Sequence, residues 1–306
     1  EVWVETTRIL GKPGYEALAF ALLAGFAAPL FQVSRKSGAV VSLAGASGAG
    51  KTISIRYGLS VWSDPAAFFI SPQGTNNAKD NLFKTATNLP LVIDDISGPL
   101  MRNIKGLIYT AANGIAKETL TKDRELREQS RWCTLVALTT NNSIMDLPAD
   151  IVTDAEKCRT LEITFDTPVD PADGATLSNV AEMHYGHAGE PFIRYVIKHR
   201  AFVAEMCDKA VDHINKMPGV NPANRYGIWL CALALVAGRI ARKLHLIQFN
   251  PELAVEYALK SLRGNISTQR APSALMRDLV AEYIQDNWGK IARKTERISS
   301  PINLDL

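Results

Sequence analysis

Short apolar runs alternate with helical patterns over the middle of the chain. Between two of these runs, apolar spacing predicts a helix over Leu100–Ala112. Buried strands separated by helices are typical of a parallel sheet with crossover helices, so the pattern predicts an α/β fold. The runs with the length and composition of buried strands are Val40–Ala44, Phe68–Ile70, Leu91–Ile93, Thr134–Leu138 and Leu161–Phe165.

Helical patterns flank this middle part on both sides. The apolar stretch Ala17–Phe31 ends near Pro29 and is shorter than the ~20 residues that a bilayer requires. We therefore expect it, like the run Leu230–Ala241, to be a buried core helix, and we expect no membrane association. Downstream, helices are predicted over Pro191–Met217, Tyr226–His245, Pro251–Arg263 and Ala274–Arg293. Prolines, aspartates and an Asp-Gly pair predict a linker over Asp166–Ala175.

Composition, charge, cysteine spacing and the first residue each limit the interpretation. With 47% hydrophobic residues the chain can bury a large core, and its formal charge of +3 does not by itself indicate a nucleic-acid partner. The cysteines are far apart and form no C-x-x-C pair, which favours free thiols in a reducing cytoplasm. The chain begins with Glu1 rather than Met, so we expect it to come from a longer protein.

The most specific motif follows the first predicted strand and precedes a helical pattern. Its glycines allow a tight turn whose N–H groups converge on an anion, and a helix starting near Lys51 adds its positive end. We expect Lys51 to reach the phosphates and the Thr52 hydroxyl to bind Mg²⁺. The alternative is a glycine-rich turn with a surface lysine. The residues that match G-x-x-x-x-G-K-[ST] are Gly45, Ala46, Ser47, Gly48, Ala49, Gly50, Lys51 and Thr52.

A second apolar run ends in two carboxylates. Leu91–Ile93 is followed by Asp94 and Asp95. We expect Asp94 to hold Mg²⁺ and Asp95 to orient or deprotonate the attacking water. The alternative is an acidic turn after a strand. Together with the glycine-rich loop, this pair predicts ATP and Mg²⁺ as the cofactors.

Asn141 and Arg159 complete the candidate catalytic set. Asn141 follows the run Thr134–Leu138, and we expect it to contact the attacking water or the γ-phosphate; alternatively, it caps the strand. Arg159 comes just before the last run. It would project to a neighbouring subunit's nucleotide and stabilise charge on the γ-phosphate, or it is an exposed arginine at a strand start.

The polar segment Asn113–Arg131 is the candidate nucleic-acid contact. Two short strands turning near Lys122 would form a hairpin that presents Lys117, Lys122 and Arg124. In a ring of subunits, such hairpins would line the pore and bind the phosphates of single-stranded DNA. The alternative is a solvated loop with balanced charge.

The order of these motifs resembles that of AAA+-type P-loop ATPases, especially superfamily-three-like helicases of phages and mobile elements. A more detailed likeness is to a prophage and plasmid family labelled a domain of unknown function and often found beside primase modules. Asp95 and Ala49 depart from the usual Glu and Thr, which affects the expected hydrolysis rate more than nucleotide binding. The segments that carry the likeness are Gly14–Leu18 with Phe26–Leu30, Gly45–Thr52 with Ser60–Trp62, Tyr109–Gly114 with Arg131 and Trp132, and His184–Gly189 with Phe192.

The resemblance implies an ATP-hydrolysing replicative helicase or translocase that acts as a homo-oligomeric, hexameric ring on single-stranded DNA in the cytoplasm of a bacterial host. A primase domain or protein is a candidate partner. We expect an N-terminal helical packing element over residues 1–37, an AAA+-like P-loop NTPase core over 38–170 and a C-terminal helical domain over 171–306.

Three further expectations qualify this reading. A nucleotide-gated loading or assembly ATPase is the alternative function, and a P-loop small-molecule kinase fits less well because no acceptor pocket or lid pattern is evident. His184 and His187 are three residues apart with no third ligand nearby, so we expect a turn with packed histidines rather than a metal site.

Overall fold

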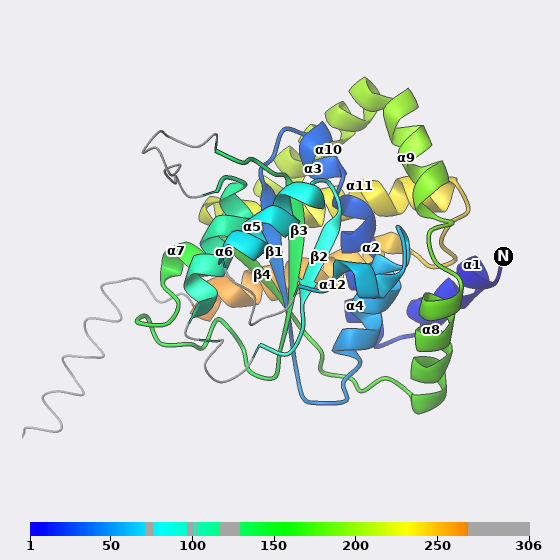
Figure 1. Cartoon of the computed structure of the whole chain (residues 1–306), viewed down its shortest axis with the longest axis horizontal. Coiled ribbons are helices and arrows are strands. Elements are labelled where there is room, and N and C mark those ends of the chain that lie inside the picture. The colour runs from blue at the N-terminus through cyan, green and yellow to red at the C-terminus, as the bar shows by residue number, and fades with distance from the viewer. Residues whose placement is uncertain (71–75, 97–100, 102, 117–128, 269–306) are drawn as a thin grey trace, which may run out of the picture. The chain divides into compact units, whose positions relative to one another are not determined.

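The computed structural model describes residues 1–70, 76–96, 101, 103–116 and 129–268 (Figure 1). By its internal contacts the chain divides into two units, Glu1–Asn265 and Ile266–Leu306, and the first of them contains the sheet. None of the described helices is long and apolar enough to cross a bilayer.

The described part of the chain is built around one parallel sheet. The strand order is β2-β3-β1-β4, and every neighbouring pair runs parallel, which confirms the predicted α/β class. All four strands therefore end at the same edge of the sheet. The strands are β1 (Gly38–Ala44), β2 (Pro90–Ile93), β3 (Thr134–Thr140) and β4 (Thr160–Thr164).

The run Phe68–Ile70, which we expected to be a fifth strand, is not one. Pro65–Phe68 forms a 3-10 helix, η2, because Pro65 suits the first helical position and the Asp64 carboxylate accepts a hydrogen bond from the Ala66 N–H. Only Phe69 then pairs with β2, in a single parallel bridge to Val92.

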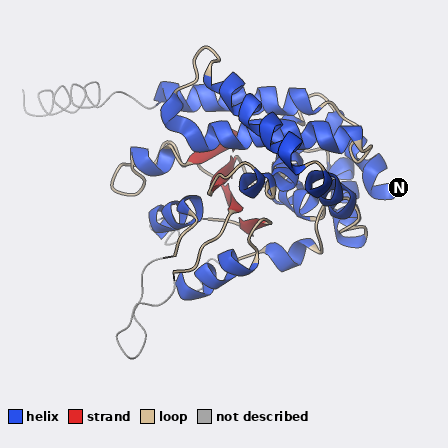
Figure 2. Cartoon of the chain, turned by 90° about the horizontal axis from the view of Figure 1, so that it is seen from above, coloured by secondary structure: helices blue, strands red, loops and turns tan. Residues whose placement is uncertain are grey.

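Helices surround the sheet, and Figure 2 shows the strands between helical layers. The helices up to β4 are α1 (Val2–Thr6), η1 (Thr7–Gly11), α2 (Glu16–Ala27), α3 (Leu30–Val33), α4 (Lys51–Leu59), α5 (Asn76–Thr85), α6 (Ile104–Asn113) and α7 (Asp154–Lys157). Those after β4 are α8 (Pro171–Met183), α9 (Gly189–Lys198), α10 (Arg200–Asn215), η4 (Pro222–Asn224), α11 (Arg225–Lys243) and α12 (Pro251–Thr268).

The predicted buried helices are confirmed, and two helix boundaries are corrected. Every residue of α2 after Glu16 is buried, as are most residues of α11. The helix predicted over Pro191–Met217 is two helices, broken at His199. Helix α8 begins inside the predicted linker, because Asp170 caps it and Pro171 takes its first position. The predicted helix Ala274–Arg293 lies outside the described residues.

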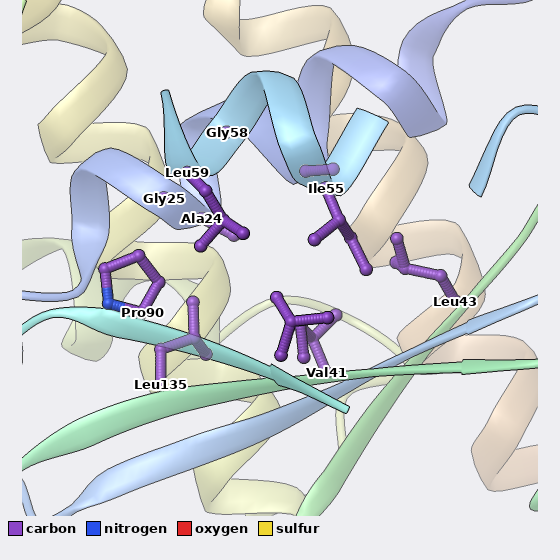
Figure 3. Close-up of a pocket in the computed structure, with 12 residues that line it drawn as sticks. Ala24, Gly25, Val41, Leu43, Ile55, Gly58, Leu59, Pro90 and Leu135 are labelled. Carbon is purple, nitrogen blue, oxygen red and sulfur yellow. The ribbon is translucent and has the colours of Figure 1, made fainter. Parts of the chain in front are cut away.

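Helix α4, which follows the glycine-rich loop, is held tightly against α2. A Cβ on Gly25 would lie 2.5 Å from the carbonyl oxygen of Gly58, so only glycine permits this approach. Beneath α4 is a cavity of about 20 Å³, lined on the helix side by Ile55 and on the sheet side by Val41 and Leu43 (Figure 3). Because its lining is almost wholly apolar, we expect the cavity to stay dry.

Candidate nucleotide-binding site

The glycine-rich loop connects β1 to α4, and α4 begins at Lys51 as expected. Gly48 and Gly50 have φ angles of +80° and +96°, a region that other residues rarely adopt. A Cβ on Gly48 would meet nothing within 4 Å, so the loop is open at that point. Among the described residues, the backbone N–H groups of Ser47, Gly48 and Gly50 donate to no backbone carbonyl. These free donors at a helix start suit an anion such as a phosphate group.

The loop is supported from the segment that follows β4, which sequence reasoning did not connect with it. A Cβ on Gly50 would lie 2.3 Å from Cγ2 of Val169, and one on Gly45 would lie 2.9 Å from the carbonyl oxygen of Phe165. Both glycines are therefore needed for close packing as well as for their backbone angles. The segment leading into α8 thus forms one wall behind the loop.

Lys51 points into the loop and is nearly buried. Its Nζ atom donates to the carbonyl oxygens of Gly45 at 2.6 Å and Ala46 at 2.8 Å, and to Oδ1 of Asn141 at 3.2 Å. Burial lowers the pKa of the Lys51 ammonium, and the nearby charges of Asp94 and Asp95 oppose this shift. The structure therefore places a desolvated cation between the loop and the tip of β3.

Asp94 is the centre of a second hydrogen-bonded group. Thr52 Oγ1 donates to Asp94 Oδ1 at 3.1 Å, and Thr139 Oγ1 donates to the same oxygen at 2.5 Å. Strand register explains the contact between Thr139 and Asp94. Ile93, the last residue of β2, is opposite Leu138, so Asp94 directly after β2 comes beside Thr139 of β3. A hydroxyl beside a carboxylate at the mouth of a phosphate loop is a donor set suited to Mg²⁺.

Thr139 was not assigned a role from the sequence. Its hydroxyl donates to Asp94 and accepts a 2.7 Å hydrogen bond from the Asp95 N–H, so it fixes the turn in which both acids lie. The available signal was a pair of threonines at the end of a buried strand, which also suits a simple strand end. The pairing of β3 with β2 shows that Thr139 lies beside the two acids and does more than end a strand. That pairing depends on the fold and cannot be read from the local sequence.

Asp95 is exposed and has a φ of +54°, in the left-handed region. Aspartate tolerates this region better than most residues other than glycine. The backbone conformation therefore separates the two acids, with Asp94 in a hydrogen-bonded cluster and Asp95 at the surface.

The turn after β3 carries Asn141 and is tied to β4, which lies on the other side of β1 in the sheet. Glu162 of β4 is 4% exposed, and its carboxylate accepts hydrogen bonds from Ser143 Oγ at 2.5 Å and from the Ile144 N–H at 2.7 Å. Ser42 Oγ of β1 donates to it at 3.3 Å. Burial raises the pKa of Glu162, these donors oppose the shift, and the charge of Asp146 adds to it.

Arg159 is not in this group. Val40 is opposite Thr160, so Arg159 lies beside the start of β1, and the six residue steps from Ala39 to Gly45 put it roughly 20 Å from the loop. Its guanidinium lies over the rings of Tyr109 and Tyr226, 5.1 and 5.6 Å from their centroids. Arg159 Nε is buried and lacks a hydrogen-bond partner within the described ranges.

The candidate DNA contacts Lys117, Lys122 and Arg124 lie outside the described residues. The residues at either end of that segment are paired. Ile115 forms an antiparallel bridge with Arg131, and the Ala116 N–H donates to the Ser130 carbonyl at 2.9 Å. The segment therefore leaves and re-enters the described chain at one place, next to the start of β3.

The segment His184–Gly189, to which we assigned no chemistry, packs against the end of α4. The N–H groups of Gly186 and Gly189 donate to the carbonyls of Ser60 and Val61, both at 2.8 Å. A Cβ on Gly189 would lie 2.7 Å from the Trp62 ring. His184 and His187 are exposed, so the expectation of packed histidines is wrong. The glycines make the close contacts, because only they allow the two backbones to approach.

Comparison with known proteins agrees with this geometry at the level of the fold. A family described as a domain of unknown function, DUF927, matches residues 10–131. No significant match among curated proteins was found. The chain is similar to a solved structure titled "SCCmec type IV Cch - active helicase", at 20% sequence identity with a TM-score of 0.72.

The alignment with that helicase covers 94% of this chain and 55% of the other, so the chain spans about half the length of the solved protein. At this identity the likeness shows the fold alone. The chain has a helicase-like α/β fold with a P-loop NTPase-like core.

Proposed function

We propose that the chain is the ATP-hydrolysing motor domain of a replicative DNA helicase or translocase, of the kind that phages and mobile elements encode. It binds ATP and Mg²⁺, acts as a homo-oligomeric ring, with six subunits as the leading expectation, and moves on single-stranded DNA in the bacterial cytoplasm. The observation that carries the proposal is the convergence of Lys51, Thr52, Asp94 and Asn141 at one edge of the sheet.

Each residue has a chemical task in this proposal. The loop N–H groups and Lys51 bind the phosphates, and Lys51 exchanges its present carbonyl acceptors for phosphate oxygens. Thr52 and Asp94 would hold Mg²⁺, which neutralises phosphate charge when bound. Asp95 and Asn141 orient the attacking water. Arg159 acts on the site of a neighbouring subunit, since it is too far from the loop of its own chain.

The decisive experiment compares the ATPase rate of the purified chain with and without single-stranded DNA, together with displacement of a labelled strand. We expect DNA to stimulate hydrolysis and Lys51→Ala to abolish nucleotide binding or turnover. Lys243→Ala, which removes an exposed lysine near Tyr195, is the matched control and should behave as the unsubstituted chain. An ATPase rate that DNA does not change, together with no displacement of the labelled strand, would reject the helicase proposal.

A nucleotide-gated loading or assembly ATPase is the second candidate. The observation that favours it is the short side chain of Asp95, which is exposed at the position where a longer glutamate is usual. Such a protein would change its oligomeric state with ATP and hydrolyse it slowly. Binding to DNA distinguishes the two, because a pore that contacts several phosphates loses affinity steeply as salt rises. A primase as partner belongs to either candidate.

A further inference from the structure

Glu162 is a buried carboxylate in the middle of β4, between the apolar residues Leu161 and Ile163. Burying such a group is costly unless hydrogen bonds compensate it. Its donors come from two places: Ser42 lies on the adjacent strand β1, whereas Ser143 and Ile144 lie in the turn after β3. The shorter contacts, 2.5 and 2.7 Å, are those to the turn.

This turn begins with Asn141, two residues before Ser143. Asn141 is also the side chain that contacts Lys51, at 3.2 Å. The Glu162 carboxylate thus binds the turn through Ser143 and Ile144. At the start of the same turn, the side chain of Asn141 accepts a hydrogen bond from Lys51 of the glycine-rich loop. Further along, Lys157 Nζ donates to the carbonyl of Met145 at 2.6 Å and holds the far end of the turn.

We propose that Glu162 is a positioning residue for the nucleotide site, which sets the place of Asn141 by fixing the turn between Asn141 and Ile144. This inference rests on the proposed function for its effect on turnover. Its structural part, the coupling of Glu162 to Asn141, stands on the hydrogen bonds alone.

The competing explanation is that Glu162 only satisfies polar groups of the core. In that case all its donors would be equivalent, and removal of any one would affect stability without a selective effect at the site. Ser42 and Ser143 separate these explanations, because both give a hydroxyl to the same carboxylate but only Ser143 belongs to the turn.

The experiment therefore compares Ser143→Ala with Ser42→Ala in the full 306-residue chain. We expect Ser143→Ala to lower kcat about tenfold, since small misplacements of a catalytic group have effects of this order or larger, with the affinity for a non-hydrolysable ATP analogue unchanged. Ser42→Ala should keep the kcat of the original chain. Glu162→Gln, which retains one acceptor for the Ile144 N–H, should give an intermediate kcat.

Two further readouts test the route through Asn141. In an Asn141→Ala background, Ser143→Ala should have no additional effect on kcat. In chains labelled with ¹⁵N at asparagine, the side-chain amide signal of Asn141 should shift in Ser143→Ala and stay in place in Ser42→Ala. The signal is identified by its loss in Asn141→Ala.

Equal effects of the two serine substitutions on the Asn141 signal, or no effect of either, overturn the inference. A loss of kcat in Ser143→Ala that persists undiminished in the Asn141→Ala background also overturns it. If the original chain hydrolyses no ATP, the proposed function fails, and the amide signal still decides whether Glu162 positions Asn141.

Discussion

At the scale of single residues, Asp94 and Asp95 are adjacent in sequence and have opposite surroundings. Asp94 accepts hydrogen bonds from two threonine hydroxyls, while Asp95 is exposed and has a left-handed backbone. A carboxylate fixed by neighbours suits a metal ligand, and an exposed one next to it is free to meet water. The structure thus gives the two acids different surroundings, which suit the two different roles proposed for them.

Replacing Asp95 by asparagine tests its role without disturbing the fold. Asparagine tolerates the same left-handed φ, so we expect the free energy of unfolding and the nucleotide affinity of Asp95→Asn to stay unchanged. Turnover should fall by about 100-fold or more, because loss of a general base has effects of that order. Steady-state kinetics and denaturant unfolding measure both. Asp150→Asn, at another exposed aspartate, is the control, and equal turnover in the two variants would remove Asp95 from the mechanism.

Glu162 gives a pH dependence of stability. Because its pKa is raised in the folded chain above the ordinary 4.5, the folded state keeps this proton longer than the unfolded chain does. The contribution of Glu162 to stability is therefore full below pH 4.5 and is lost as the pH rises through the folded pKa. The like charge of Asp146 also raises the pKa of Glu162 and so acts in the same direction.

We therefore expect the difference in unfolding free energy between the original chain and Glu162→Gln to change across that window, with the original chain losing stability relative to the variant as the pH rises. Urea unfolding at a series of pH values measures the difference. A difference that is constant with pH would show that Glu162 has the same pKa in both states.

At the scale of elements, α2 and α4 approach each other most closely at Gly25 and Gly58, where the backbones are in contact. We expect Gly25→Ala to cost about 1–3 kcal/mol of unfolding free energy, since the new methyl group would lie 2.5 Å from the Gly58 carbonyl and force the helices apart. Gly106→Ala in α6 is the control. Its Cβ would meet nothing within 4 Å, so it should stabilise the chain by about 0.5–1 kcal/mol. Denaturant unfolding compares them, and a stabilised Gly25→Ala chain would contradict the packing described here.

Much of the fold was predictable at this scale, for physical reasons. Apolar runs identify buried strands and buried helices such as α2 and α11. A glycine-rich loop between a strand and a helix is a local pattern, so it can also be recognised from the sequence. The start of α8 was misread because Pro171 and Asp170 suit a loop and a helix start equally well. Phe68–Ile70 was misread because aromatic residues pack well with or without strand pairing.

The candidate site was predictable in its residues and only partly in its contacts. Lys51, Thr52 and Asp94 belong to local motifs, so they could be named from the sequence. The parts played by Thr139, Val169 and Glu162 depend on strand register and on contacts between distant segments. An acidic residue between two apolar residues of a strand was the one signal for Glu162, and it carries no information about the hydrogen-bond partners of Glu162.

At the scale of the whole molecule, Arg159 and the glycine-rich loop lie at opposite edges of the sheet. One chain therefore cannot bring them together, and the proposed role of Arg159 requires a neighbouring copy. The three divisions proposed from the sequence, 1–37, 38–170 and 171–306, remain a prediction about the domain organisation of each chain.

Mixing variants tests this arrangement. We expect Arg159→Ala to bind nucleotide normally and lose turnover, and Lys51→Ala to lose binding. In a mixture of the two, a Lys51→Ala subunit supplies its arginine to the intact loop of its neighbour, so part of the turnover should return. Mass measurement with and without an ATP analogue shows whether the mixed assemblies form. Full activity of Arg159→Ala alone, or mixed assemblies with no regained turnover, would exclude the role in trans.

The position of the segment between Ala116 and Ser130 has a consequence for how related chains can diverge. Since both of its ends are joined beside the start of β3, insertions or deletions within it need not move Thr139 or Asn141. A single residue gained or lost inside β3 would exchange the two faces of the strand and remove the hydroxyl from Asp94. We therefore expect related chains to differ in the length of the segment before β3 but to keep the length of β3 itself.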